Sequence, residues 1–565
     1  RTCLVGSEMC IRDSFNAYMN AIDEVGKLNL IKNLNNGVSI KISALHPRYE
    51  MRKFKDLESE LIPRLIELVH YAHSKDVEIT IDAEEQDRLT LSLNIIEKLA
   101  LDKVIKNWTG FGIALQAYGK RSINVIHWIN KILDKREKMH LRLVKGAYWD
   151  YEIKHAQVFG YEDYPVYSKK SLTDISFLLC AKEILKNEKI YAKFATHNAH
   201  TISSVHQLGQ GKDYEFQRLY GMGELLYQSA EKVLNLEKKP SVYAPIGSYK
   251  DLLPYLVRRL LENGANSSFI NRLLDPETDA NWLAENPAIR IEKEKIDIPL
   301  PKNIFTERKN SSGFDLSENS NLENLEKSIS AHKKNKINAE SIYVNRDEKE
   351  KVGQKVYSIA NNEEIGTAIF DDPTNVKSAL ENFASEKWSK YSVQERSQIL
   401  IKISDDIEKD PSELIFYLLN EAGKTIQNAI DEIREAIDFL RYYSRQIIEI
   451  HGKKSLQGPT GEINNISYSP KGNYLCISPW NFPVAILIGQ ISAALACGNN
   501  VVVKPSENTS ILGYLIVKKF HEKGVPIETL QLILGDGMYG DVLTKVNTIN
   551  GCLLYTSPSP RDKSS

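Results

Sequence analysis

No run of apolar residues in this sequence reaches the roughly 20 positions that a membrane-spanning helix needs. An excess of one charge is missing too, because 73 basic side chains stand against 74 acidic ones, a formal net charge of −1. This balance argues against nucleic acid or an anionic membrane as the main partner. Cysteine is scarce, with 6 in 565 residues, which excludes a disulfide framework and favours free thiols in a reducing compartment. The remaining composition, 42% hydrophobic and 26% charged, is typical of a globular chain long enough for about three or four domains.

The two ends of the chain share an unusual property at the level of codons. MCIRDS at 9–14 and CLLYTS at 552–557 can be written as one DNA string and its reverse complement, in different frames. The string is similar to a transposase adapter used in sequencing libraries. We therefore expect residues 1–14 and 552–565 to be translated adapter, and we exclude them from the fold prediction. Ordinary flexible tails are the alternative.

The first half of the chain alternates short β-rich runs with longer amphipathic stretches of helical period. A strand followed by a helix, repeated, predicts a parallel sheet. Seven runs with almost no hairpin signal favour a (β/α)8 barrel over residues 15–290 that lacks one strand, which we expect at the N-terminal side. An open doubly wound sheet is the alternative, but no Gly-x-Gly-x-x-Gly follows any run. The predicted strands are residues 38–43, 77–84, 111–116, 140–146, 190–197, 214–221 and 241–247.

Polar side chains stand near the carboxyl ends of all seven runs, where barrels of this kind carry their chemistry. Taken singly, each is more often a structural ion pair or part of a solvated loop than a functional residue. Seven polar ends in seven strands favour a common site. These residues are Lys41, Asp82, Gln116, Arg142 with Lys145, His197, Gln217 and Tyr243.

The stretch YLVRRLLE at 255–262 places four polar side chains within an arc of about 100° on one helix face. These side chains are Tyr255, Arg258, Arg259 and Glu262. Two adjacent guanidinium groups repel unless an anion lies between them, and their forked donors suit a carboxylate or a phosphate. A solvated basic face with Glu262 as its intrahelical partner is the alternative.

The composition changes after the barrel. Residues 291–345 are rich in Lys, Glu, Asn and Ser, which predicts a linker or surface excursion. Helical periodicity returns at 375–387 and 392–450. A strand at 472–478, an apolar helix at 483–497 and a buried strand at 500–504 follow, so residues 346–551 predict a second α/β domain of Rossmann type.

Six collinear blocks of the first domain resemble the signature runs of the proline dehydrogenase family, as found in bacterial bifunctional proline utilisation proteins. The resemblance implies an FAD-dependent barrel that oxidises L-proline to Δ1-pyrroline-5-carboxylate, without a metal. The blocks are KISALHPRY at 41–49, DAEE at 82–85, RLVKGAYW at 142–149, FATHN at 194–198, YEFQRLYGMGE at 214–224 and YLVRRLLE at 255–262.

The same resemblance assigns roles to individual residues. Lys41, Arg258 and Arg259 would hold the substrate carboxylate, while Tyr243 and Tyr255 would wall the pyrrolidine ring. Asp82 and Tyr148 would belong to the polar network around the site, and Glu262 would keep the arginine helix in register. Arg142 would lie by the flavin N5. The further expected flavin-binding residues are Gln116, Lys145, Gly146, Thr196, His197, Asn198 and Gln217.

The second domain resembles the cofactor-binding half of an aldehyde dehydrogenase, through EAGKT at 421–425, PWNFP at 479–483 and KPSE at 504–507. By this resemblance Asn481, next to Trp480, donates to the oxyanion of a thiohemiacetal. Lys504 and Glu507 would bind the adenosine ribose of NAD, and a helix would follow GDG at 535–537.

The catalytic half of such an enzyme has no counterpart in this sequence. Neither a Gly-Gln-x-Cys nor a Glu-x-Gly-Gly-Lys segment occurs, and we interpret Cys476 and Cys497 as small buried hydrophobes. We therefore expect no glutamate semialdehyde oxidation from this chain, although a longer parent protein would oxidise it with NAD. A non-catalytic second domain and an inactive fragment are the alternatives.

The resemblance also bears on partners and location. It implies a quinone as electron acceptor, a homo-oligomer in the intact parent, and a cytoplasmic protein that can dock at the inner membrane. No nucleic-acid partner is expected from this part of the protein.

Overall fold

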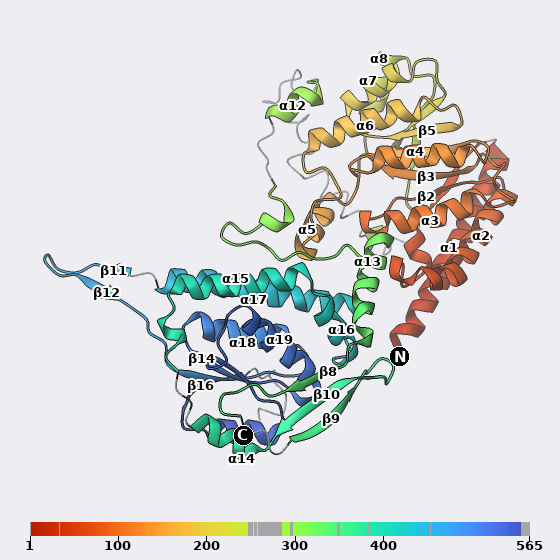
Figure 1. Cartoon of the computed structure of the whole chain (residues 1–565). Coiled ribbons are helices and arrows are strands. Elements are labelled where there is room, and N and C mark those ends of the chain that lie inside the picture. Colours follow the sequence, from red (N-terminus) through yellow and green to blue (C-terminus); the bar gives the residue numbers. More distant parts are fainter. Residues whose placement is uncertain are drawn as a thin grey trace. The chain divides into compact units, whose positions relative to one another are not determined.

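The computed structural model describes residues 2–32, 34–246, 252–253, 257, 285–293, 298–346, 351–381, 383, 385–451 and 454–554. The chain divides into two compact units (Figure 1). Unit 1 comprises residues 1–156, 163–298 and 315–319, and unit 2 comprises 157–162, 299–314 and 320–565.

Unit 1 contains one parallel sheet whose strands lie in sequence order, from β1 at one edge to β7 at the other. The seven strands occur at the seven predicted places, so this part of the prediction is confirmed. Strands that neighbour one another strictly in sequence order are typical of a barrel. In a doubly wound sheet the order in which strands are added would reverse part of the way across the sheet. The strands are β1 (Gly37–Ile40), β2 (Glu78–Ile81), β3 (Phe111–Gln116), β4 (Met139–Val144), β5 (Ile190–Ala195), β6 (Tyr214–Leu219) and β7 (Ser241–Tyr243).

Contacts across the sheet prove that it is curled. In a flat sheet β2 and β5 would lie about 14 Å apart, at roughly 4.8 Å per strand. Instead, Lys193 Nζ in β5 lies 2.5 Å from Glu78 Oε2 in β2. Likewise, Arg142 Nη1 in β4 donates to Ser39 Oγ in β1 at 2.9 Å. These side chains therefore face one another inside a barrel.

Helices connect and cover the strands of unit 1, as the amphipathic stretches predict. Helix α3 (Leu89–Ala100), for example, buries Leu91, Ile95 and Leu99, which recur at helical spacing. The helices are α1 (Thr2–Lys32), α2 (Phe54–Ser74), α3 (Leu89–Ala100), α4 (Ser122–Leu133), α5 (Trp149–Phe159), α6 (Lys170–Ile184), α7 (Ala199–Leu208), α8 (Glu224–Leu234) and α12 (Pro287–Lys293).

The segments expected to be adapter or linker contain regular elements. Residues 2–14 form the first part of α1, and residues 552–554 end the last strand, β16 (Ile549–Leu554). The adapter origin of both ends stays a prediction. Within the predicted linker lie α13 (Asn319–Ser330) and β8 (Ile337–Glu340), and β8 pairs with a strand of unit 2.

The main sheet of unit 2 has four parallel strands in the order β15-β14-β13-β16. The chain first builds outward from β13 (Asn473–Ile477) through β14 (Asn500–Lys504) to β15 (Leu530–Leu532), and then returns to place β16 on the other side of β13. This reversal is the topological switch point at which open α/β sheets bind ligands, beyond the carboxyl ends of the strands.

Two small sheets accompany the main one. β8 and the antiparallel pair β9 (Lys351–Tyr357) and β10 (Glu364–Asp371) form one, in the order β8-β10-β9. β11 (Lys454–Leu456) and β12 (Asn464–Ile466) form a hairpin.

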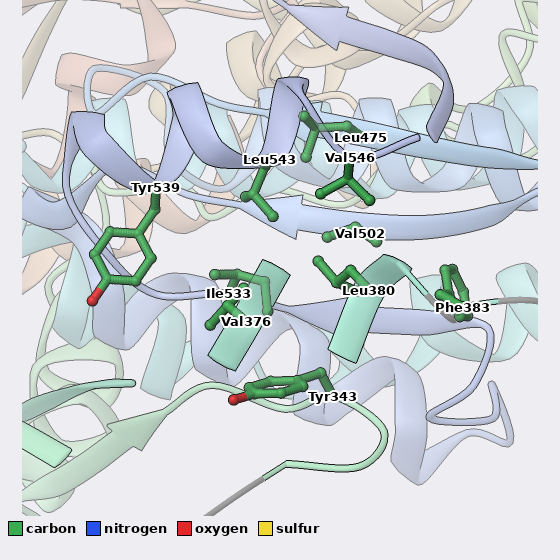
Figure 2. Close-up of a cluster of buried hydrophobic side chains, with 10 residues drawn as sticks. All are labelled: Tyr343, Val376, Leu380, Phe383, Leu475, Val502, Ile533, Tyr539, Leu543 and Val546. Atoms are coloured by element: carbon green, nitrogen blue, oxygen red, sulfur yellow. The ribbon is translucent and has the colours of Figure 1, made fainter. Parts of the chain in front are cut away.

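Helices cover the main sheet, and one part of its core appears in Figure 2. There Leu475 and Val502 of the sheet pack against Val376 and Leu380 of α14 (Pro373–Glu381), and all four side chains are fully buried. The helices of this unit after α13 are α14 (Pro373–Glu381), α15 (Val393–Lys409), α16 (Ser412–Asn420), α17 (Ile426–His451), α18 (Ala485–Ala496), α19 (Ser510–Glu522) and α20 (Gly537–Thr544).

Candidate functional site

The inside of the barrel is lined by polar side chains, whereas barrels of this class are normally filled by Val, Ile and Leu. Residues two apart in a strand share a face, so an alternating pattern separates the two faces. Apolar residues such as Ile79, Leu141 and Phe194 alternate with these positions and are fully buried. The inward-facing polar residues that contact one another include Glu78, Thr80, His140, Arg142, Lys193, Glu215 and Gln217.

Arg142 of β4 lies at the centre of the predicted site, and its guanidinium lies close to residues of four other strands or strand ends. Nε donates to Gln217 Oε1 at 2.8 Å, and Nη1 donates to Ser39 Oγ at 2.9 Å. Asp82 Oδ1 is 3.8 Å from Nη1, and the Tyr243 ring centroid is 5.0 Å from Cζ, within cation–π range. Five residues from five strands or strand ends are thus brought together, three of which (Arg142, Asp82 and Tyr243) were predicted as catalytic.

Lys41 forms a second cationic group at the same end of the barrel. Its Nζ donates to the hydroxyl oxygen of Tyr148 at 3.0 Å. Burial by itself would lower the pKa of Lys41, but the Tyr148 hydroxyl and the carboxylates of Asp82 and Glu84 raise it. Lys41 therefore carries a positive charge at neutral pH and can attract an anion.

Asp82 is partly buried, and this burial raises the pKa of its carboxyl group, while Arg142 and Lys41 act in the opposite direction. Tyr18 of α1 contacts Lys41 and was not predicted. The Lys41 backbone N–H donates to the Tyr18 hydroxyl oxygen at 3.0 Å, and burial raises the pKa of the Tyr18 hydroxyl. No local pattern in the sequence marks Tyr18, because its role depends on where α1 packs.

Three predicted flavin-binding residues lie at the carboxyl ends of β3 and β4: Gln116 ends β3, and Lys145 and Gly146 follow β4. Gln116 Nε2 donates to the Glu84 carbonyl oxygen at 2.8 Å, and its Oε1 accepts from the Ala147 N–H at 3.0 Å. Its amide thus joins two of the loops at the barrel mouth. Lys145 is ion-paired with Asp174. Gly146 has a φ of +144°, and a Cβ there would lie 2.4 Å from the Tyr118 ring, so this turn requires glycine.

The three predicted residues after β5 are held by neighbouring loops. The Leu219 N–H donates to His197 Nε2 at 3.1 Å, which makes this nitrogen an acceptor. Asn198 caps α7, since its Oδ1 accepts from the Thr201 N–H at 2.9 Å. The Thr196 carbonyl accepts from the Tyr227 hydroxyl at 2.8 Å.

The predicted arginine helix lies outside the described residues. Tyr255, Arg258, Arg259 and Glu262 therefore keep the roles assigned to them as predictions.

Glu152 of α5 was missed by the sequence analysis although it links three loops of the mouth. Its Oε1 accepts from the Gln86 N–H at 2.8 Å, after β2, and from the Tyr118 hydroxyl at 3.2 Å, after β3. Burial, together with the negative charges of Asp87 and Glu85, raises its pKa to about 7. No local pattern in the sequence marks Glu152, because its burial depends on how α5 packs.

The donor set at the barrel mouth fits an FAD. Guanidinium, ammonium, amide and imidazole groups of Arg142, Lys145, Gln217 and His197 belong to neighbouring strand ends, and the Gly146 backbone is exposed beside them. Such donors suit the acceptor atoms of an isoalloxazine ring and the anionic diphosphate.

In unit 2 the predicted oxyanion loop, residues 479–483, follows β13 at the switch point. Trp480, Asn481 and Phe482 are all exposed. The buried carboxylate of Glu432 holds the end of this loop in place. Its Oε1 accepts from the N–H groups of Val484 at 2.7 Å and Ala485 at 3.2 Å. These N–H groups belong to the start of α18, which has no intrahelical partner for them.

A lysine completes this support. Lys424 Nζ lies 2.5 Å from Glu432 Oε2 and 4.0 Å from the Phe482 ring centroid. Lys424 lies within the EAGKT motif, but no role was predicted for it. Asn481 therefore stands on a loop that an ion pair and two helix N–H groups hold in place.

Lys504, the last residue of β14, lies beside Glu507, and the two were predicted to bind the ribose of NAD. Lys504 Nζ donates to the Pro505 carbonyl oxygen at 3.2 Å and lies 3.8 Å from Glu507 Oε2. Burial lowers the pKa of Lys504. An ammonium beside an exposed carboxylate fits the two hydroxyl groups of a ribose, so the pair suits NAD.

The cysteines of this unit differ from one another. Cys476 is fully buried and its pKa is raised by burial, as expected of a small hydrophobe. Cys497 is only partly buried, which corrects the prediction for this residue, and burial raises its pKa as well. Both thiols are thereby less nucleophilic.

Comparisons with known proteins divide the chain in the same way. The profile of proline dehydrogenases matches residues 4–272, and that of the aldehyde dehydrogenase family matches residues 343–558. The chain is 39% identical over 566 residues to the "Bifunctional protein PutA" of Salmonella typhimurium, and equally to that of Escherichia coli K12. Each alignment covers 96% of this chain and 42% of the relative, so the chain spans less than half of these proteins.

A solved structure of proline utilization A from Bradyrhizobium japonicum matches with a TM-score of 0.86 at 38% identity. The match covers 97% of this chain and 54% of that one. Together with the barrel of unit 1 and the parallel sheet of unit 2, these findings establish the domain content. The chain carries a proline dehydrogenase barrel followed by an aldehyde dehydrogenase domain, and over both it is similar to the bifunctional PutA proteins.

Proposed function

We propose that unit 1 oxidises L-proline to Δ1-pyrroline-5-carboxylate with FAD as its cofactor. The observation that carries this proposal is the pair of cations at the barrel mouth, Lys41 and Arg142, surrounded by Asp82, Tyr148 and Tyr243. When bound, FAD would accept a hydride from the C5–H bond of proline, while the ring nitrogen releases its proton and the C5=N double bond forms. The chain's own residues bind and orient the substrate.

Substrate binding begins with the carboxylate of proline. Lys41 is one charged donor for it, and in this proposal Arg258 and Arg259 supply the forked donors that fix the carboxylate plane. Holding this anionic end determines where the ring lies, and correct placement lowers the entropic part of the barrier. Tyr243 and Tyr255 then wall the ring and exclude larger amino acids, and Glu262 keeps the arginine helix in register.

FAD itself would be held by the groups at the strand ends. Arg142, whose guanidinium donates to Ser39 and Gln217, would lie by the flavin ring near N5. The other residues assigned to the cofactor are Gln116, Lys145, Gly146, Thr196, His197, Asn198 and Gln217.

Unit 2 is proposed to bind NAD through Lys504 and Glu507, with Trp480 beside the cofactor. Asn481 would supply a preplaced neutral donor for an oxyanion in a longer parent protein, which oxidises glutamate semialdehyde. No helix within the described part of the chain is long and apolar enough to cross a membrane. A quinone as final electron acceptor, a homo-oligomeric parent and a cytoplasmic location with docking at the inner membrane complete the proposal.

The test uses the purified chain incubated with FAD. We expect the yellow protein to reduce an artificial dye when L-proline is added, and to form Δ1-pyrroline-5-carboxylate in equal amount. A chain that binds FAD but reduces no dye with proline would contradict the proposed substrate, and a chain that binds no FAD would support the inactive-fragment alternative. Isothermal titration with NAD tests unit 2 separately, and Lys504→Ala should weaken binding about tenfold.

A further inference from the structure

The side-chain amide of Gln217 lies between two groups of opposite hydrogen-bonding character. On one side its Oε1 accepts from Arg142 Nε at 2.8 Å. On the other side its Nε2 donates to Glu215 Oε1 at 2.8 Å. Glu215 and Gln217 are two residues apart in β6, so both face the inside of the barrel.

Only one orientation of the Gln217 amide satisfies both neighbours. A guanidinium can only donate, and a carboxylate can only accept. If the amide rotated by half a turn, its NH2 group would face Arg142 and its oxygen would face Glu215. A donor would then face a donor at Arg142, and an acceptor would face an acceptor at Glu215. This would happen inside a largely buried space, where unpaired polar groups are costly. Glu215 therefore selects the orientation that presents an acceptor to Arg142.

Glu215 is itself held in place by its neighbours. In the sheet register Arg142 pairs with Lys193, and Lys193 pairs with Glu215. Lys193 Nζ lies 3.8 Å from Glu215 Oε1, and the Tyr191 hydroxyl donates to Oε2 at 3.3 Å. The Glu215 side chain is only 16% exposed. It therefore cannot turn freely toward solvent and release the amide.

From this chain of contacts we infer that Glu215 is a positioning residue, which acts through Gln217 to fix the guanidinium of Arg142 toward the cofactor. The inference rests on the proposed function, because Arg142 is assigned there to FAD. Glu215 does not touch substrate or cofactor in this scheme. Its effect comes entirely from the orientation of one amide.

The decisive variant is Glu215→Met, which keeps the length of the side chain and removes the acceptor. We expect the dissociation constant for FAD, measured by quenching of flavin fluorescence, to rise about tenfold. The midpoint potential of the bound flavin should shift to more negative values, since the positive charge of Arg142 is held less closely. A purely structural role would lower the melting temperature of the apoprotein without moving the potential.

The conservative variant Glu215→Gln provides the rescue. Its amide oxygen can still accept from Gln217 Nε2, and its NH2 group can donate to the Tyr191 hydroxyl oxygen. The orientation of Gln217 that presents an acceptor to Arg142 is then again favoured, and we expect FAD affinity within about threefold of the wild-type value. Tyr191→Phe is the matched control, because it removes a contact to Glu215 Oε2 and leaves the Oε1 contact with Gln217 intact. Its FAD affinity and potential should equal those of the wild type.

Crystal structures of the wild-type and Glu215→Met apoproteins separate this inference from the proposed function. We expect Arg142 Nε to lose its contact with Gln217 Oε1 in the variant. An unchanged Arg142 in the variant, an unchanged potential, or a Glu215→Gln variant no better than Glu215→Met would overturn the inference. If the wild-type chain binds no FAD, the proposed function fails, and the crystal structures alone decide whether Glu215 positions Arg142.

Discussion

The ammonium nitrogen of Lys41, just after β1, lies 3.0 Å from the hydroxyl oxygen of Tyr148, at the start of α5, although 107 positions separate the two residues. The same nitrogen is 5.7 Å from the centroid of the Tyr148 ring. Tyr148 thus limits where the charge of Lys41 can lie at the barrel mouth.

Tyr148→Phe should weaken proline binding while FAD stays bound. The variant keeps the ring and removes the hydroxyl that holds Lys41, so the ammonium loses about one hydrogen bond, worth roughly 1 kcal/mol. We expect the KM for proline to rise about five- to tenfold with kcat changed less. Steady-state dye reduction measures both constants. A normal KM together with lost FAD would place Tyr148 at the cofactor instead.

Gly146→Ala should damage the turn after β4. The new Cβ would lie 2.4 Å from the Tyr118 ring, and the φ of +144° is strained for any L side chain. We expect a loss of about 2–3 kcal/mol in the free energy of unfolding, by overpacking and strain, and at least tenfold weaker FAD binding. The control is Gly221→Ala, where φ is +75° but no atom lies within 4 Å of the added Cβ. This control should cost only about 1 kcal/mol and leave FAD binding unchanged.

Glu152 should make the stability of unit 1 depend on pH. Burial raises its pKa from 4.5 to about 7 in the folded chain. Between these values the folded state holds a proton that the unfolded state has released, so stability is highest at low pH and falls as pH rises through this window. The contribution is at most about 3 kcal/mol, at 1.36 kcal/mol per pKa unit.

Glu152→Gln tests this dependence, because Gln can still accept from the Gln86 N–H and the Tyr118 hydroxyl. The stability of the variant relative to the wild type should increase between pH 5 and pH 7.5 in urea unfolding. An equal difference at both pH values would mean that the Glu152 carboxyl does not titrate in this window.

Lys424→Met should destabilise unit 2 by about 3 kcal/mol. It leaves the carboxylate of Glu432, which is 0% exposed, without its ion-pair partner. Adding Glu432→Gln removes the unpaired charge, so the double variant should recover part of this loss. Denaturant unfolding of the full chain measures both, and a double variant as unstable as the sum of the single variants would contradict the coupling.

The sequence alone determined the order of strands and helices in unit 1 and part of that in unit 2. Short β-rich runs between amphipathic stretches located all seven barrel strands, and the helical period located α15 to α17, because these patterns reflect which face of an element is buried. The polar residues at the strand ends, such as Lys41 and Arg142, were also found, since the position of a residue along a strand follows directly from the pattern. Family-like motifs added the expected roles.

Only the tertiary structure decided which side chains meet. Lys193 contacts Glu78 at a separation of 115 positions, and Glu215 acts on Arg142 through Gln217. Periodicity tells which face a residue occupies, but the partner across the barrel depends on the curl and register of the whole sheet. For the same reason Tyr18, Glu152 and Glu432 could not be assigned from the sequence: each acts on a loop that long-range packing brings to it.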